Sequence, residues 1–488
     1  MWREDGIDPH PTLAYAAGAR ATLGRARHNS TGDPLEWSPQ RNLTMAIVLK
    51  DWQRVQRYLR RQAKKRGFDF SNAPDPRQQG KVRILRRTIH WAFLLGMLGG
   101  RKSGRTAESL TKKLEGWART LVPQPISDTT LHTEAARLDD EYIIEKLVQQ
   151  IRGMNRDKVL KPCNGLLGTA TCDGKNLATM DHDGDGRAHE RSSENEKWHD
   201  KSRPKNSTYF LVPALRCTLT SAVSKPCIYQ MAIEPGTGES TAFPTFVDRL
   251  DSAYGRSGLI ELIDGDAGLC SLGNADHVDS LGYLYLLGLK GNQPELFEAA
   301  QVVLYARLEA YAPEAVTDWE CRDGKKIRRL LWRSPELKGF ENSVGSWDHL
   351  EQVWLVRQET KDSKGAISIE DRFFVTSIPW KRLSPHQILV TVRNHWGVEN
   401  DSFHSLDVQW LEDSGAWCTK GNAVWGLGAL RLIALNIAQY LRKRHLCKKR
   451  DDGSQGPPET WHEVFELICD ALKREDTAGS RQPNAAFA

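Results

Sequence analysis

The sequence of 488 residues lacks an uninterrupted hydrophobic run of the ~20 residues that a membrane-spanning helix needs. Its beginning, Met1-Trp2-Arg3-Glu4-Asp5, has no apolar segment of the kind found in a secretory signal. The nine cysteines are an odd number and include no C-x-x-C pair, which disfavours a disulfide framework and a zinc ribbon. These absences predict a soluble protein with reduced thiols, located in the cytoplasm of a bacterial cell.

The chain also lacks a large excess of charge of either sign, since its 68 Lys and Arg residues face 62 Asp and Glu residues. The distribution is uneven, however: residues 50–105 contain sixteen Lys and Arg but only three acids, Asp51, Asp69 and Asp75. A local field of this sign favours a polyanion such as DNA, although a solvated helix face explains it equally well. The length predicts two to four folding units.

Residues 43–155 are predicted to be all-helical. Apolar residues recur there at three- and four-residue steps, which predicts helices over 43–68 and 82–99, a third from residue 106, and a fourth from a Ser127 cap towards Ile151. The basic character of this helical region favours a DNA-binding role. Residues 1–42 are polar and without period, and we expect a loose basic arm there.

The pattern changes after residue 160 to a mixture of strands and helices. Strands are predicted over 166–172, 209–220, 227–233, 259–263 and 283–289, with a helix over 240–250, so residues 160–300 read as an α/β core with a mixed sheet. The pattern of residues 301–380 predicts a β-rich insertion. Residues 381–445 are predicted to be helical again, beginning with a capping box at Ser384 and Gln387. Residues 446–488 predict a polar tail with a short helix over 461–472.

Three carboxylates stand where metal-dependent chemistry on phosphate would need them. Asp173 and Asp266 each follow a predicted strand, and Glu399 lies on the capped helix, one turn after His395. Mg²⁺ prefers oxygen ligands, and two such ions stabilise the attacking and leaving oxygens of a phosphoryl transfer. Each residue alone is more often a turn, cap or surface residue, and Asp264 competes with Asp266 for the second position.

Longer motifs surround these carboxylates. The most specific is Arg393-Asn394-His395-Trp396-Gly397-Val398-Glu399-Asn400, followed by Phe403-His404-Ser405-Leu406-Asp407-Val408 and Glu412-Asp413. It resembles the R-x-H-W-x-I-E-N-x-L-H-W-x-L-D-V…E-D signature of bacterial insertion-sequence transposases, in the ISAs-type branch of the insertion-sequence-four superfamily. Asp173-Gly174-Lys175 is similar to their D-G-K motif. Asp266-Ala267-Gly268 with Lys290-Gly291-Asn292-Gln293-Pro294 is similar to their second-aspartate block.

The resemblance implies a DDE transposase with an RNase H-like catalytic core, a β-rich insertion and an all-helical N-terminal region. It implies two Mg²⁺ ions, for which Mn²⁺ can substitute, held by Asp173, Asp266 and Glu399. The expected partners are double-stranded DNA, both the terminal inverted repeats and the target, and a second copy of the chain on paired DNA ends. The residues that we expect to contact DNA are Lys175, Lys290, Arg393 and His395.

The chain departs from the superfamily's Y-x-x-R-x-x-x-E-x₆-K pattern around Glu399. Val392 stands at the Tyr position, His395 at the Arg position and Leu406 at the Lys position. These changes leave two alternatives open: a DNA-binding remnant or co-opted transposase without strand transfer, and a related metal-dependent endonuclease.

Overall fold

The computed structural model describes residues 39–64, 69–192, 207–322, 324–414, 417–446 and 459–475. Most of the predicted arm, and residues 447–458 and 476–488 of the predicted tail, lie outside these ranges. The chain divides into two units, Met1–Ile47 and Val48–Ala488, and the description below concerns the second.

The N-terminal part of this unit is helical. Its elements are the part of α1 (Pro39–Lys64) that follows Ile47, then α2 (Arg86–Leu98), α3 (Gly104–Lys112), α4 (Gly116–Leu121), α5 (Asp128–Ala135) and α6 (Asp140–Arg156). The predicted single helix from Ser127 towards Ile151 is wrong, because two helices occupy this stretch. Ser127 caps α5 by accepting from Thr130 N, and Asp139 caps α6 by accepting from Tyr142 N, so a second start signal interrupts the first helix.

Eleven strands of the described residues form one mixed sheet, in the order β2-β3-β1-β5-β6-β13-β12-β9-β7, with β4 beside β3 and β8 beside β9. β1, β5 and β6 are parallel, and the other pairs are antiparallel. The strands are β1 (Thr169–Met180), β2 (His189–Ser192), β3 (Thr208–Leu219), β4 (Cys227–Ala232), β5 (Leu262–Gly265), β6 (Leu284–Leu289), β7 (Ala315–Val316), β8 (Glu320–Arg322), β9 (Lys325–Ser334), β12 (Gln352–Lys361) and β13 (Ile367–Thr376). The prediction of a mixed α/β fold is confirmed.

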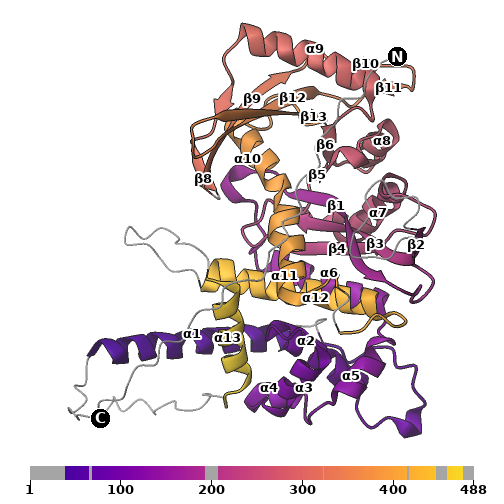
Figure 1. Ribbon diagram of the computed structural model, residues 1–488, viewed down its shortest axis with the longest axis vertical. Coiled ribbons are helices and arrows are strands. Elements are labelled where there is room, and N and C mark those ends of the chain that lie inside the picture. Colours follow the sequence, from indigo (N-terminus) through magenta and orange to yellow (C-terminus); the bar gives the residue numbers. More distant parts are fainter. Residues whose placement is uncertain are drawn as a thin grey trace. The chain divides into compact units, whose positions relative to one another are not determined.

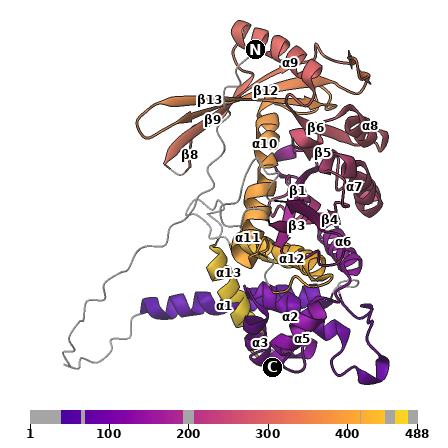
Figure 2. The same ribbon diagram turned by 45° about the vertical axis from the view of Figure 1, so that its right-hand side comes forward.

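The later strands continue the same sheet, because β13 pairs directly with β6 (Figures 1 and 2). A short pair, β10 (Phe340–Glu341) and β11 (Ser346–Trp347), stands apart. The segment predicted as β-rich from residue 301 begins in fact with a helix, α9 (Pro294–Ala310). Its buried residues Leu296, Ala300 and Leu304 recur at four-residue steps, a helical period that the strand interpretation overlooked.

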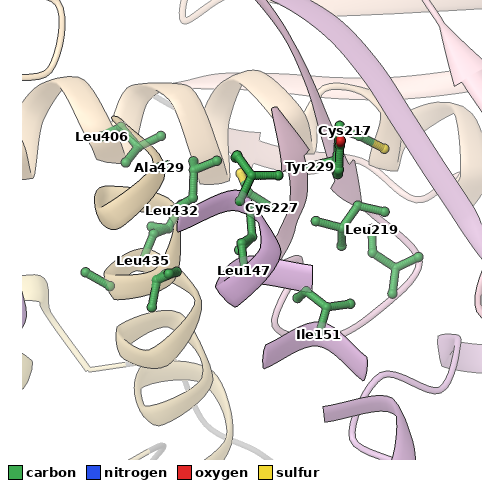
Figure 3. Close-up of a cluster of buried hydrophobic side chains, with 14 of the residues drawn as sticks. Leu147, Ile151, Cys217, Leu219, Cys227, Tyr229, Leu406, Ala429, Leu432 and Leu435 are labelled. Atoms are coloured by element: carbon green, nitrogen blue, oxygen red, sulfur yellow. The ribbon is translucent and has the colours of Figure 1, made fainter. Parts of the chain in front are cut away.

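Helices cover both faces of the sheet. On one side lie α7 (Glu239–Tyr254), α8 (Leu272–Ser280) and α9, and on the other α10 (Pro385–His395), α11 (His404–Trp410) and α12 (Ala423–Tyr440) (Figure 1). α12 is the central helix, since all of its residues except Tyr440 are buried. Figure 3 shows its leucines packed against side chains of α6, β3, β4 and α11. α13 (Trp461–Leu472) packs on α2 and α4.

One helical stretch, Ala423–Arg444, is long and apolar enough to cross a membrane, but 94% of its most apolar window is buried inside the protein. It is therefore the core helix α12 and its continuation. Eight of the nine cysteines lie in the described residues, and all eight are free thiols, six of them buried.

Candidate active site

Asp173 lies within β1, at a point where the strand loses one of its two neighbours. β5 pairs with residues Thr169 to Cys172 only, whereas β3 pairs with β1 as far as Met180. The prediction that the strand ends at Asp173 is wrong, because the pairing with β3 carries it further. One edge of β1 is therefore open at Asp173, which places this half-buried carboxyl beside the end of β5.

Asp266 follows β5 and caps the short 3₁₀ turn Ala267–Leu269, where its side chain accepts from Leu269 N at 3.3 Å. The motif around Lys290 holds this turn in place. Asn292 Nδ2 donates to the carbonyls of Ala267 (2.7 Å) and Cys270 (3.0 Å). Gly288 lies beneath the turn, where an added Cβ would stand 3.0 Å from Ala267 N. The end of β6 thus fixes the backbone that carries Asp266.

Asp264 is fully buried within β5 and is committed to other side chains. Its Oδ2 accepts a hydrogen bond from Thr171 Oγ1 at 2.7 Å, and both oxygens lie 3.0 Å from His395 Nδ1. Burial disfavours the charged imidazole, but the Asp264 carboxylate outweighs it, with Asp173 and Asp266 adding, and the pKa of His395 rises to about 9. The ring is therefore a cation at neutral pH.

Glu399 lies on a π-helical turn. The capping box at Ser384 and Gln387 is present and starts α10, which ends at His395. The chain then continues as the π-helix η6 (Val398–Phe403), in which His404 N donates to the Glu399 carbonyl. The prediction that Glu399 belongs to the capped helix is therefore wrong: the wider turn begins before it, and such turns frequently mark functional sites. Glu399 is exposed to solvent.

Charges from distant parts of the sequence act on one another at this edge of the sheet. Burial first, and then the carboxylates of Asp266 and Glu399, raise the pKa of Asp173 to about 7, while the positive ring of His395 opposes them. A carboxyl perturbed by burial and by specific like charges is typical of a functional site. Three acids separated by 93 and 133 residues in the chain therefore share one electrostatic environment.

Comparisons with known proteins assign the chain to a family. Residues 173–437, more than half of the chain, match the transposase DDE domain family. The chain belongs to the DDE transposase family. Two relatives from Escherichia coli K12, the "putative protein YbfL" and the "H repeat-associated putative transposase YhhI", are each 25% identical over 244 residues, which is 49% of this chain. The chain spans 60% of the length of each of these relatives.

Within this DDE-family chain, the lysines and the arginine that we expected to contact DNA have different surroundings. Lys175 is largely buried, and its ammonium forms an ion pair with Asp407 of α11. Lys290 is exposed at the end of β6. Arg393 is exposed near the end of α10 and forms an ion pair with Glu320 of β8. Lys175 thus connects β1 with α11, while Lys290 and Arg393 remain accessible from solvent.

Sequence reasoning missed a fourth carboxylate. Glu239 is the first residue of α7, and an added Cβ at Gly174 would overlap its carboxyl group. Burial, and then Asp266, raise the pKa of Glu239, so its charge also belongs to the group around Asp173. The signal in the sequence was the glycine of the D-G-K motif, because only glycine leaves room for this close approach.

A buried ion pair lies next to Asp173 and involves its neighbour on β3. Arg216 is the cross-strand partner of Asp173, and its guanidinium donates to Glu412 at 2.6 and 2.9 Å. Both side chains are fully buried. Burial alone would raise the pKa of Glu412, but Arg216 holds it below its ordinary value. The Glu of the E-D pair in the sequence signature therefore has a structural partner in β3.

The donors at this site have the chemistry that Mg²⁺ prefers, since all of them are carboxylate oxygens. Among the residues that the structure describes, no three His, Cys, Asp or Glu side chains are gathered closely enough to hold a metal ion as they stand. Burial first, and then the carboxylates of Asp266 and Glu399, disfavour the charged form of Asp173 and raise its pKa. A cation would favour the charged form, so the donor set fits a divalent metal.

Proposed function

We propose that the protein is a DNA transposase that cleaves the ends of an insertion sequence and joins them to target DNA. Asp173, Asp266 and Glu399 are its catalytic carboxylates. The observation that carries this proposal is the mutual influence of these three charges at one edge of the sheet, within a chain of the DDE family. Asp266 is favoured over Asp264 because Asp264 is fully buried against Thr171 and His395.

The fold supports a more specific assignment. Parallel strands β1, β5 and β6, with antiparallel β3 and β4 on one edge, are what an RNase H-like core would provide. The signature around Glu399 supports the ISAs-type branch of the insertion-sequence-four superfamily. In this proposal, β7 to β13 form the insertion between the second Asp and the Glu. The helical region before β1 binds the terminal repeats, through phosphates for affinity and base edges for specificity.

Asp173, Asp266 and Glu399 would hold two Mg²⁺ ions, or Mn²⁺ in their place. When bound, these ions would lower the pKa of the attacking water or 3′-hydroxyl and neutralise charge on the scissile phosphate.

The other residues bind and position. Asp264 fixes the His395 ring, whose positive charge attracts the phosphate that approaches the carboxylates. The Lys175–Asp407 ion pair holds β1 against the helix that follows Glu399. Lys290 contacts DNA phosphates at the end of β6. A homodimer would bring two element ends together.

The test uses a plasmid that carries the gene with its natural flanking DNA. Asp173→Ala and Glu399→Ala should abolish nicking and strand transfer but leave DNA binding intact, whereas the surface variant Asp183→Ala should remain active. Unchanged nicking by either active-site variant would sink the proposal.

Two further arms of this experiment refine the assignment. Precut DNA ends separate a transposase, which joins them, from a nuclease, which does not. Asp266→Asn should abolish nicking without loss of the folded state. Full activity of Asp266→Asn would transfer the second position to Asp264.

A further inference from the structure

A pocket of about 440 Å³ opens beside the turn that carries Glu399. Strands β8, β9, β12 and β13 contribute to one side, and the end of α10 with Trp396, Gly397 and Asn400 forms the other. Figures 1 and 2 both show β8 and β9 near α10. Two acids line the pocket, Glu320 and Asp401, and five cationic side chains: Lys225, Arg322, Arg329, Arg372 and Arg393. The lining therefore has a surplus of positive charge.

Both acids of the pocket are already paired. Glu320 forms an ion pair with Arg393. Asp401 lies 3.0 Å from Lys225 and 2.8 Å from Lys443, which together hold its pKa below the ordinary value against the effect of burial. Glu320 is shared between Arg393 and Arg329, so two acids face five cations in the lining.

Arg329 is the cation of the pocket with two buried guanidinium nitrogens that lack hydrogen-bond partners in the described part of the chain. Its side chain is buried, with 7% of the residue exposed, and neither Nε nor Nη1 has a hydrogen-bond partner among the described residues. The nearest carboxylate oxygen, on Glu320, is 3.9 Å from Nη1. Burial first, and then the neighbouring Arg393, lower the pKa of Arg329. A buried guanidinium with unsatisfied donors is costly, and an anion in the pocket would satisfy it.

Trp396 forms the apolar wall of the pocket and orients the arginines. The guanidinium of Arg372 lies 4.1 Å from the centre of the Trp396 ring, and that of Arg329 lies 6.0 Å from it. Arg372 also forms an ion pair with Glu370 at 2.8 Å, so a phosphate would compete with this carboxylate, which does not line the pocket, for the N–H groups of Arg372. Two arginines are thus arranged around one wall.

We propose that this pocket binds a phosphate group of the DNA strand that lies at Glu399, with Arg329, Arg372 and Arg393 as the donors. The assignment of DNA as the source rests on the proposed function. Neighbouring arginines bind phosphate oxygens through charge-assisted hydrogen bonds, which are stronger than hydrogen bonds between neutral groups. An internal phosphodiester and a 5′-terminal phosphate offer the same chemistry.

The first test measures the salt dependence of binding to a 30-base-pair duplex by the full chain. Arg329→Gln and Arg372→Gln should each weaken binding about tenfold and reduce the slope of log K against log salt by about 1, as expected for one lost phosphate contact. Lys338→Gln is the matched control, because Lys338 is an exposed cation between β9 and β12 that does not line the pocket. It should leave the slope unchanged.

The outcomes separate this inference from the proposed function. Wild-type slopes in both pocket variants, together with loss of nicking in Asp173→Ala, would overturn the pocket and leave the transposase intact. Failure of the wild-type chain to bind DNA would overturn both. If Arg329→Gln does not fold, Arg372→Gln carries the test, since Arg372 is partly exposed.

A second test identifies the source of the phosphate. Duplexes with a 5′-phosphate and with a 5′-hydroxyl are compared on the wild type and on Arg329→Gln. A preference for the 5′-phosphate that the variant loses assigns the pocket to a strand end, and equal binding with a reduced slope in the variant assigns it to an internal phosphodiester. Inorganic phosphate should raise the wild-type melting temperature more than that of Arg329→Gln. Such an effect without any change in the DNA slope would overturn the assignment to DNA.

Discussion

The metal-free protein should become more stable when Asp173 loses its charge. The pKa of this carboxyl is about 7 in the folded protein, against an ordinary value of 3.8. A group with a raised pKa keeps its proton in the folded state after the unfolded chain has released it, so stability falls as the pH rises from about 4 to about 7. A difference of about 3 pKa units corresponds to about 4 kcal/mol above pH 7. Asp173→Asn should recover this amount.

The assay is thermal unfolding in EDTA at pH 8 and pH 5. For a unit of roughly 440 residues, about 4 kcal/mol corresponds to a rise of about 4 °C in the melting temperature. The rise should shrink to less than about 2 °C at pH 5, where much of the wild-type destabilisation is gone. Asp183→Asn, an exposed control, should change little at either pH. A variant that melts at or below the wild type at pH 8 would refute the argument that burial and the neighbouring carboxylates make the charge of Asp173 destabilising.

Three other substitutions test separate contacts. Asp264→Asn should lower the pKa of His395 from about 9 towards its ordinary value of 6.5, measured by NMR of labelled histidine without metal, and a ring that still titrates near 9 would contradict the pairing. In the wild type, the stability from this pair should be present below about pH 6.5 and lost as the pH rises to about 9. Glu412→Gln leaves Arg216 buried without its carboxylate and should destabilise the protein by about 3–5 kcal/mol in urea unfolding, and a loss below about 1 kcal/mol would speak against the buried pair. Gly174→Ala should reduce nicking at least about tenfold with little change in melting, because the new methyl displaces the carboxyl of α7. Full activity would show that this carboxyl is not needed.

Local patterns predicted much of the fold. The capping box at Ser384 and Gln387 is a contact between neighbours in sequence, and it is present. Strand predictions for β3, β4 and β6 agree with the structure within a residue or two, because these strands are buried and bounded by turn residues. Where two local signals followed closely, as with Ser127 and Asp139, a single helix was the wrong interpretation.

The site depended on contacts that no local pattern contains. Lys175 pairs with Asp407, 232 residues later, and nothing near Lys175 in the sequence indicates that partner. The sequence predicted that the strand ends at Asp173 because the hydrophobic run stops there. In the structure, the pairing of β1 with β3 continues beyond Asp173. The pocket around Arg329 is formed by residues of four strands and of the end of one helix, which lie far apart in the sequence. Long-range packing, rather than propensity, decides such features.

The two aspartates at the end of β5 show how burial divides similar residues between roles. Asp264 is fully buried, and Thr171 and His395 satisfy its carboxylate oxygens. Asp266 stands past the last strand pair, partly exposed, in a turn that Asn292 fixes from β6. A carboxylate that orients a positively charged side chain is best buried with it. A carboxylate that acts on a substrate is best placed on rigid backbone at an accessible edge of the sheet. On the proposed function, Asp266 therefore meets the requirements of the second catalytic carboxylate, and Asp264 those of the residue that positions His395.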